Sequence, residues 1–303
     1  MPQAIGYAVL AGLFSSALFL ALSTGLPGMV LLAYFVQLPL LFAGLTLGLA
    51  ASALAAAAAI LVCGLIAGVV AAAMFTLVQA IPAVMVVRQA LLSRQDGGQV
   101  EWYPPGLVLA QLTAFAVLGI VAAFVVLIGH PGGLAGVLAD FLSATLSGLG
   151  ASEVAISPGP GLERWLFLFP GLMAASWLVM VALNTALAQA LAVRFGVNRR
   201  PTPHLSELEL PGWLWPAIGV AALLALLGDG GFAFLGRALL IVLTVPYVFL
   251  GLAVVHAFAR RVAHRRLALG LFYGAIMLLG WPILAVLLLG FVEDWAHVRQ
   301  RFL

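Results

Sequence analysis

Long apolar runs fill most of this sequence, and short polar or charged turns separate them. The run over residues 51–87 contains no charged side chain, and the first charged residue of the chain is Arg88. About 20 apolar residues cross the hydrocarbon core of a bilayer as a helix, whereas a membrane β-barrel alternates apolar and polar positions along short strands. The pattern therefore predicts membrane-spanning helices, which satisfy their own backbone hydrogen bonds.

Turn residues and charges divide the chain into nine candidate spans. We expect an all-α polytopic membrane bundle of about eight or nine transmembrane helices, forming a single integral membrane domain over residues 1–303. The candidate spans cover residues 4–22, 29–49, 51–71, 73–92, 104–129, 164–193, 211–227, 232–259 and 267–291.

Composition agrees with a lipid-embedded chain and excludes several kinds of chemistry. Charged residues make up 8% of the chain and hydrophobic residues 65%, against about a quarter charged residues in soluble domains. All 13 basic residues are arginine, so lysine-based Schiff-base and P-loop chemistry is excluded. The single cysteine, Cys63, cannot form an intramolecular disulfide.

The arginines indicate the orientation of the spans. Cytoplasmic loops are enriched in basic residues, and alternation of the candidate spans brings three arginine-bearing loops to one side. We expect that side to face the cytoplasm of a bacterial inner membrane. A straight last span would send Arg299 and Arg301 to the opposite side, whereas a bent or re-entrant helix at Gly280–Pro282 would not. The arginine loops contain Arg88 and Arg94; Arg194, Arg199 and Arg200; and Arg260, Arg261, Arg265 and Arg266.

Two further segments have amphipathic patterns. Residues 133–149, in the acidic loop on the other side, place leucines at helical spacing and are expected to form an outer re-entrant or interfacial helix. Residues 291–303 repeat aromatic and aliphatic residues on one helical face and are expected to form an amphipathic tail at the headgroups.

The first span carries a small residue at every fourth position: Ala4, Ala8, Gly12 and Ser16. Such ladders let helix backbones approach closely in lipid. Packing within the bundle is one interpretation of the ladder. Docking of a separate membrane protein on the first helix is the other.

Polar side chains inside the apolar spans are candidates for the lining of a ligand cavity, because uncompensated polar groups in hydrocarbon are costly. Two glutamines precede prolines in similar strings, Val36-Gln37-Leu38-Pro39 and Val78-Gln79-Ala80-Ile81-Pro82. Prolines free backbone carbonyls, and broken helices frame binding sites in many transporters. Interhelical hydrogen bonding is the alternative role of these side chains. The cavity candidates are Asn184, Gln79, Gln37, Gln189, Tyr247 and Arg237, the last through recognition of an anionic group.

Signatures of catalysis are absent from the sequence. There is no G-x-S-x-G, no Walker loop and no pair of carboxylates within a span. The five histidines lack metal-ligand spacing. We therefore expect no enzyme activity, no metal and no cofactor. The arginines do not form one basic patch, so we expect no nucleic-acid partner.

The C-terminal third resembles the YybS-like family of bacterial integral membrane proteins, which is distantly similar to the substrate-binding subunits of energy-coupling-factor transporters. The tail of that family reads acidic-x-Trp-x-x-x-Arg-x-Arg, and His297 falls where an acidic residue is expected. The resemblance implies a helical bundle with a small-molecule pocket and a docking surface on the first helix. It rests on Gly251-Leu252-Ala253-Val254-Val255-His256, on Trp281-Pro282-Ile283-Leu284, and on Glu293, Trp295, Arg299 and Arg301.

These observations lead to three hypotheses of function. The first is small-molecule transport or substrate capture without an ATPase of its own, with an unidentified ligand and a membrane protein partner. The second is a non-transporting membrane scaffold that assembles other proteins. The third is an intramembrane lipid-modifying enzyme that uses the acidic outer loop.

Overall fold

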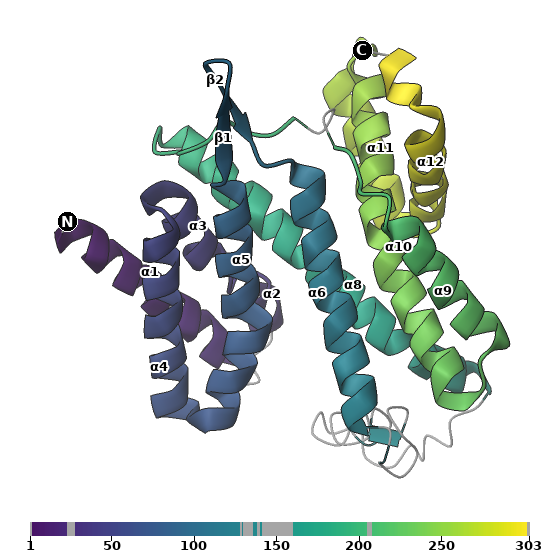
Figure 1. The fold of residues 1–303 in the computed structure, drawn as a ribbon, viewed down its shortest axis with the longest axis horizontal. Helices are drawn as coiled ribbons and strands as arrows, with labels where there is room; N and C mark the ends of the chain where they lie inside the picture. Colours follow the sequence, from purple (N-terminus) through teal and green to yellow (C-terminus); the bar gives the residue numbers. More distant parts are fainter. Residues whose placement is uncertain are drawn as a thin grey trace. The chain divides into compact units, whose positions relative to one another are not determined.

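The computed structural model describes residues 2–22, 28–127, 129, 136–137, 140, 160–204 and 208–301 of the chain. Almost all of them are helical (Figure 1). Most of the expected segment 133–149 lies outside the described residues. The elements are α1 (Pro2–Ala21), α2 (Met29–Ala33), α3 (Leu38–Leu47), α4 (Leu49–Phe75), a π-helical turn η2 (Thr76–Ala80), α5 (Ile81–Ala90), strands β1 (Ser93–Asp96) and β2 (Gln99–Trp102), α6 (Pro105–Leu127), α8 (Pro160–Arg194), α9 (Leu214–Leu227), α10 (Gly230–Ala259), α11 (Arg265–Leu279), α12 (Pro282–Ala296) and a 3-10 turn η4 (Val298–Arg301).

The prediction of an all-α polytopic bundle is confirmed. Five helices of the described residues are long and apolar enough to cross a membrane, or six if α11 and α12 count as one bent span. Two shorter apolar helices, Leu31–Leu47 and Leu214–Leu227, occupy the places of two other candidate spans. The number of long helices is lower than eight or nine because those two are short and because two candidate spans merge.

The merged spans are 51–71 and 73–92, which form one helical stretch of 42 residues, Leu49–Ala90. A straight helix of that length would extend about 63 Å, twice the thickness of the hydrocarbon core. The chain instead reverses at Gly68, whose φ of 84° and ψ of 177° are non-helical. A Cβ on Gly64 would lie 3.5 Å from the Cβ of Ala72, although a straight helix would hold these residues about 12 Å apart. The two limbs lie side by side (Figure 1), so the two predicted spans are present with the turn at Gly68.

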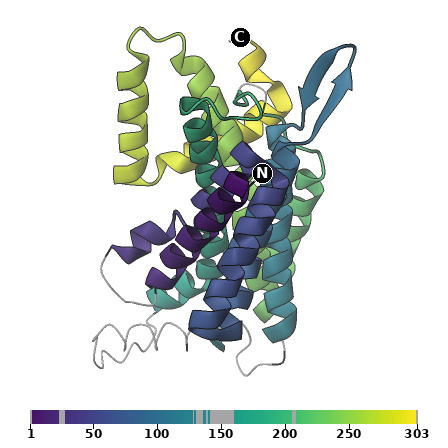
Figure 2. The ribbon, with the colours of Figure 1, turned by 90° about the vertical axis from the view of Figure 1, so that its left-hand side faces the viewer.

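The end of the chain has the bent form that the sequence offered as the alternative to a straight last span. α11 and α12 meet at Gly280–Pro282 with a change of direction of 118° (Figure 2). Gly280 adopts a φ of 71°, and Pro282 occupies the first turn of α12, where its missing N–H costs nothing. The tail is not one continuous helix, since α12 ends at Ala296 and His297 takes a left-handed conformation.

The described residues pack as two compact units rather than as one uniform bundle. The first unit comprises Met1–Leu112 and Val179–Glu207, and the second comprises Thr113–Leu178 and Leu208–Leu303. In the first unit α1 and α3 pack on α4. In the second, α10 packs between α9 and α12. The division falls within α6 and within α8.

Glycines bring the helices of the second unit into backbone contact. A Cβ on Gly251 would overlap the carbonyl oxygen of Val286, and one on Gly290 would overlap that of Tyr247. A Cβ on Gly236 would likewise overlap the backbone of α9. Small residues permit this close packing in lipid, where dispersion contacts rather than hydrophobicity hold helices together.

Candidate functional site

The first unit contains a break between α2 and α3 in which every backbone carbonyl is hydrogen-bonded. Pro39 lacks an N–H and disfavours the helical conformation before it, so the preceding turn, Tyr34–Gln37, loses regular helical partners. Side chains from α1 and α8 replace two of them. The carbonyls of Tyr34, Phe35, Val36 and Gln37 accept, in order, from Asn184 Nδ2 at 2.5 Å, Leu38 N at 3.0 Å, Ser15 Oγ at 2.6 Å and Leu41 N at 3.0 Å.

A second irregularity lies beside the first. Pro82 cannot donate to the carbonyl four residues earlier, that of Val78, and the chain there forms the π-helical turn η2. The side-chain Nε2 of Gln37 donates to the Val78 carbonyl at 3.0 Å and approaches that of Gln79 at 3.4 Å. The two glutamine–proline strings are therefore in direct contact.

Beyond these breaks, α3 and α5 form two matching half-helices. Each is ten residues long and has proline in its first turn. They run parallel, since Gln37 contacts Val78 before their starts and a Cβ on Gly44 would overlap the side chain of Val87 further along. A ten-residue helix extends about 15 Å, which is half of the hydrocarbon core.

Two consecutive arginines stabilise the far ends of these half-helices. Arg199 Nε donates to the carbonyl of Thr46 at 3.0 Å, near the end of α3, and a guanidinium nitrogen of Arg200 donates to that of Ala90 at 2.9 Å, at the end of α5. A cation near the C-terminus of a helix interacts favourably with the negative end of the helix dipole. Each break therefore lies one ten-residue helix, about 15 Å, from the arginine at the other end of that helix. Asn184 precedes Arg194 along α8 by a similar distance.

Three side-chain amide oxygens of residues at or in contact with these breaks have no hydrogen-bond partner: Gln37 Oε1, Gln79 Oε1 and Asn184 Oδ1. We call these three residues the amide site. Their side chains are 0%, 7% and 4% exposed. For Gln37 and Asn184 the chemistry fixes which amide atom is oxygen, because a backbone carbonyl can only accept and so must face the NH2 group. A buried acceptor without a partner costs about 1–3 kcal/mol, and each of the three requires an explanation.

The other cavity candidates lie elsewhere. Gln189 is buried and donates to the carbonyl of Arg200 at 2.9 Å, so it supports the arginine pair. Tyr247 belongs to the second unit, where it is fully buried among aromatic rings, with ring centroids 4.5 Å from Phe291 and 5.5 Å from Trp215. Arg237 also belongs to the second unit and is exposed on α10. The structure thus brings together three of the six cavity candidates.

The small-residue ladder of α1 is occupied from within the chain. Ala8, Gly12 and Ser16 are buried, whereas Ala4 is exposed. A Cβ on Gly12 would overlap the carbonyl oxygen of Ala55 in α4. The ladder therefore packs within the first unit. The large apolar residues on α1 that remain exposed are Ile5, Tyr7, Leu10, Leu13 and Phe14.

Sequence reasoning missed Ser15 and the two arginines as parts of this arrangement. Ser15 is a polar residue in an apolar span, which is a usable signal, but its partner is a carbonyl 21 residues away. The roles of Arg199 and Arg200 have no local signature, because their partners lie 153 and 110 residues earlier in the chain.

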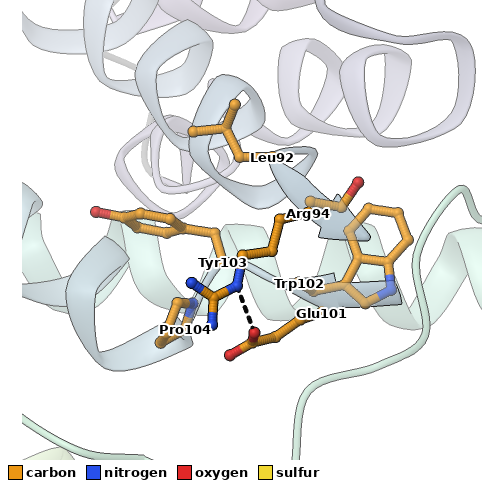
Figure 3. A pocket seen from close by; sticks show the side chains of 7 residues that line it. Leu92, Arg94, Glu101, Trp102, Tyr103 and Pro104 are labelled. Carbon is orange, nitrogen blue, oxygen red and sulfur yellow. Dashed lines mark hydrogen bonds and ion pairs between the residues drawn. The ribbon is translucent and has the colours of Figure 1, made fainter. Parts of the chain in front are cut away.

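A hollow beside the β-hairpin is a second place where polar side chains gather. The hairpin turns at Gly97 and Gly98, both with positive φ, as type I′ turns require. Arg94 Nε donates to Glu101 Oε2 at 2.6 Å across the strands (Figure 3). Both side chains are more than half exposed, so the pair contributes little. The hollow is lined by Leu92, Ser93, Arg94, Glu101, Trp102, Tyr103 and Pro104.

The tail of the second unit holds a buried ion pair. Glu293 accepts from the backbone N of Arg299 at 2.9 Å and from its Nε at 2.7 Å. The same guanidinium donates to the carbonyl of Leu208 at 2.8 Å. We call this arrangement the clasp. It joins Arg299 to Leu208, which belongs to the same unit.

Comparison with known proteins supports a membrane location. Residues 161–293 match the family model described as "Predicted membrane protein (DUF2232)". No curated protein and no solved structure gives a significant match. The described residues contain no group of three or more His, Cys, Asp or Glu side chains that could hold a metal ion. The matched segment includes Asn184, α9, α10 and most of α12, and its similarity is to an integral membrane protein.

Proposed function

We propose that this protein captures a small polar molecule at the amide site, as a step in its transport. The observation that carries the proposal is the set of three buried amide oxygens without partners, on side chains at or in contact with the two broken helices. Discontinuous helices near the midplane provide binding sites in many transporters.

A purely structural role explains the NH2 groups of Gln37 and Asn184 but not their amide oxygens. The NH2 groups of Gln37 and Asn184 satisfy carbonyls that the breaks leave free. Their oxygens, and that of Gln79, gain nothing from this arrangement. A protein selected only for stability would reduce such a cost by apolar substitution, whereas binding sites retain it.

Energy for transport would come from a partner protein, since the sequence has no Walker loop. This fits the resemblance to the YybS-like family and, through it, to substrate-binding subunits of energy-coupling-factor transporters. The partner would contact the exposed face of α1, because three of the four ladder positions are buried within the chain. In this proposal the arginine loops face the cytoplasm of a bacterium and the chain spans its inner membrane.

The proposal is tested with two variants that separate binding from stability. Gln79→Met removes an unpartnered oxygen from the amide site at similar side-chain volume. Ser15→Ala removes a hydrogen bond of the break and leaves all three amide oxygens in place. Both variants and the wild type are purified under gentle solubilisation, and copurifying small molecules are identified by mass spectrometry.

We expect one compound with the wild type and with Ser15→Ala, and its loss from Gln79→Met. We also expect the ligand-free Gln79→Met protein to be more stable than the ligand-free wild type, because an unsatisfied acceptor is gone. A Gln79→Met variant that retains the compound, or that is less stable than wild type, would contradict the proposal.

The scaffold hypothesis is supported by a different observation. None of the residues of α11 is buried, and the helix exposes large apolar side chains such as Leu271, Met277 and Leu278. A membrane partner could pack against this helix. Crosslinking from α11 in native membranes tests it: specific protein adducts would favour a scaffold, whereas labelling of lipid alone would contradict it.

A further inference from the structure

We infer that the amide site binds a small monovalent cation, either an alkali metal ion or a primary ammonium group. This inference rests on the proposed capture function and specifies the chemical class of the ligand. It follows from a count of donors and acceptors at the site.

The unpartnered atoms of Gln37 and Asn184 must be acceptors, because the NH2 group of each amide faces a backbone carbonyl. The amide oxygens of Gln37, Gln79 and Asn184 lack partners, while the NH2 groups of Gln37 and Asn184 donate to backbone carbonyls. The hydroxyl of Ser15 is likewise used, on Val36. The site therefore matches a ligand group that donates or carries positive charge and brings no acceptor of its own.

Neutral polar molecules fit this pattern poorly. A sugar or an amide carries acceptors as well as donors, and its acceptors would be buried without partners, each at a cost of about 1–3 kcal/mol. An anion would face three oxygens. A primary ammonium has three N–H donors and no acceptor, and amide-type oxygens replace the hydration shell of alkali ions in membrane sites.

The charge of the ligand is limited by its surroundings. The acidic residue of the first unit whose side chain the structure describes, Glu101, lies on the hairpin and is exposed. A divalent ion such as Mg²⁺ or Ca²⁺ prefers carboxylate ligands and would find only neutral dipoles. In potassium channels, neutral carbonyl oxygens coordinate a monovalent ion.

The experiment measures thermal unfolding of the full-length protein in nanodiscs of neutral lipid, at constant ionic strength. The salts are sodium, potassium, ammonium and methylammonium chloride, with N-methyl-D-glucamine chloride as the bulky reference cation and magnesium chloride as the divalent control. A ligand that binds only the folded state raises the melting temperature in a saturable way.

We expect at least one small monovalent cation to raise the melting temperature by about 2 °C or more over the reference. The shift should disappear in Gln79→Met and persist in Ser15→Ala. Sodium and potassium acting alone would identify a metal-ion site, and ammonium and methylammonium acting alone would identify an amine site.

Two outcomes would overturn the inference. Equal melting temperatures in all salts would exclude a cation, and a cation shift that persists in Gln79→Met would place the cation elsewhere. If either occurs while Gln79→Met still loses a copurified molecule, capture stands and only the ligand class is wrong. If no molecule copurifies with the wild type either, both proposals fail.

Discussion

Both units of this protein have close glycine contacts between helices, but they differ in how their polar side chains are used. The first unit interrupts its helices at prolines and joins the free carbonyls with side chains, Gln37, Asn184 and Ser15. The second unit brings α10 against α9 and α12 through glycines.

The difference teaches where unsatisfied polarity arises. A glycine contact uses no polar side chain and leaves no residual acceptor. An amide side chain that donates through its nitrogen to a carbonyl of a broken helix leaves its own oxygen without a partner. The first unit therefore acquires a polar site through its packing. In the second unit the charged clasp of Glu293 and Arg299 satisfies its own groups.

The largest effect is expected for Glu293→Ala, which breaks the clasp. The variant leaves the Arg299 guanidinium buried without its carboxylate, and loss of one partner of a buried ion pair costs about 3–5 kcal/mol. Unfolding in mixed micelles titrated with SDS measures the loss. The double variant Glu293→Met/Arg299→Met should recover most of the stability, and a double variant as unstable as the single one would show that the charges themselves are not the cause.

A smaller loss is expected for Gly251→Ala, which tests the glycine packing of the second unit. The new Cβ would overlap the Val286 carbonyl, so α10 and α12 must separate, at a cost of about 1–3 kcal/mol. Gly270→Ala is the matched control, because nothing lies within 4 Å of a Cβ there. The same unfolding assay should show no loss for Gly270→Ala. Equal losses at both positions would contradict close packing at Gly251.

Ser15→Ala should cost less, about 0.5–1.5 kcal/mol, because it removes one hydrogen bond to a broken helix in the first unit. Hydrogen exchange of the amides around Val36 should increase as well. Thr46→Ala provides the comparison, since the Thr46 hydroxyl donates within its own helix, to Phe42. Exchange that rises equally in both variants would mean that Ser15 does not hold the break.

Arg94→Ala is expected to have the smallest effect, about 0–1 kcal/mol, which should vanish in high salt. The pair of Arg94 and Glu101 is exposed and lies on the hairpin rather than among the helices. Thermal unfolding at two salt concentrations measures it. A loss comparable to that of Glu293→Ala would show that the hairpin contributes to the packing of the first unit.

Apolar length, proline and charge predicted much of this architecture. They placed helices at all nine candidate segments, offered a bend at Gly280–Pro282 as the alternative to a straight last span, and included Gln37, Gln79 and Asn184 among six candidate cavity residues. What they lacked was partner identity. The period of small residues in α1 does not predict that Gly12 packs against α4. The position of Tyr247 in the sequence likewise does not predict the unit to which it belongs. The hairpin was missed, although Asp96-Gly97-Gly98 is a recognised turn signal.

Two hydrogen bonds of the first unit connect residues that the ribosome synthesises at widely separated times. Asn184 reaches Tyr34 across 150 positions, and Arg200 reaches Ala90 across 110. At about 5–20 residues per second, a ribosome needs roughly 5–20 s to cover the shorter of these separations. During that interval Tyr34 and Ala90 are already made, whereas Asn184 and Arg200, which donate to their carbonyls, are not. These two hydrogen bonds of the first unit can therefore form only after more than half of the chain has been synthesised.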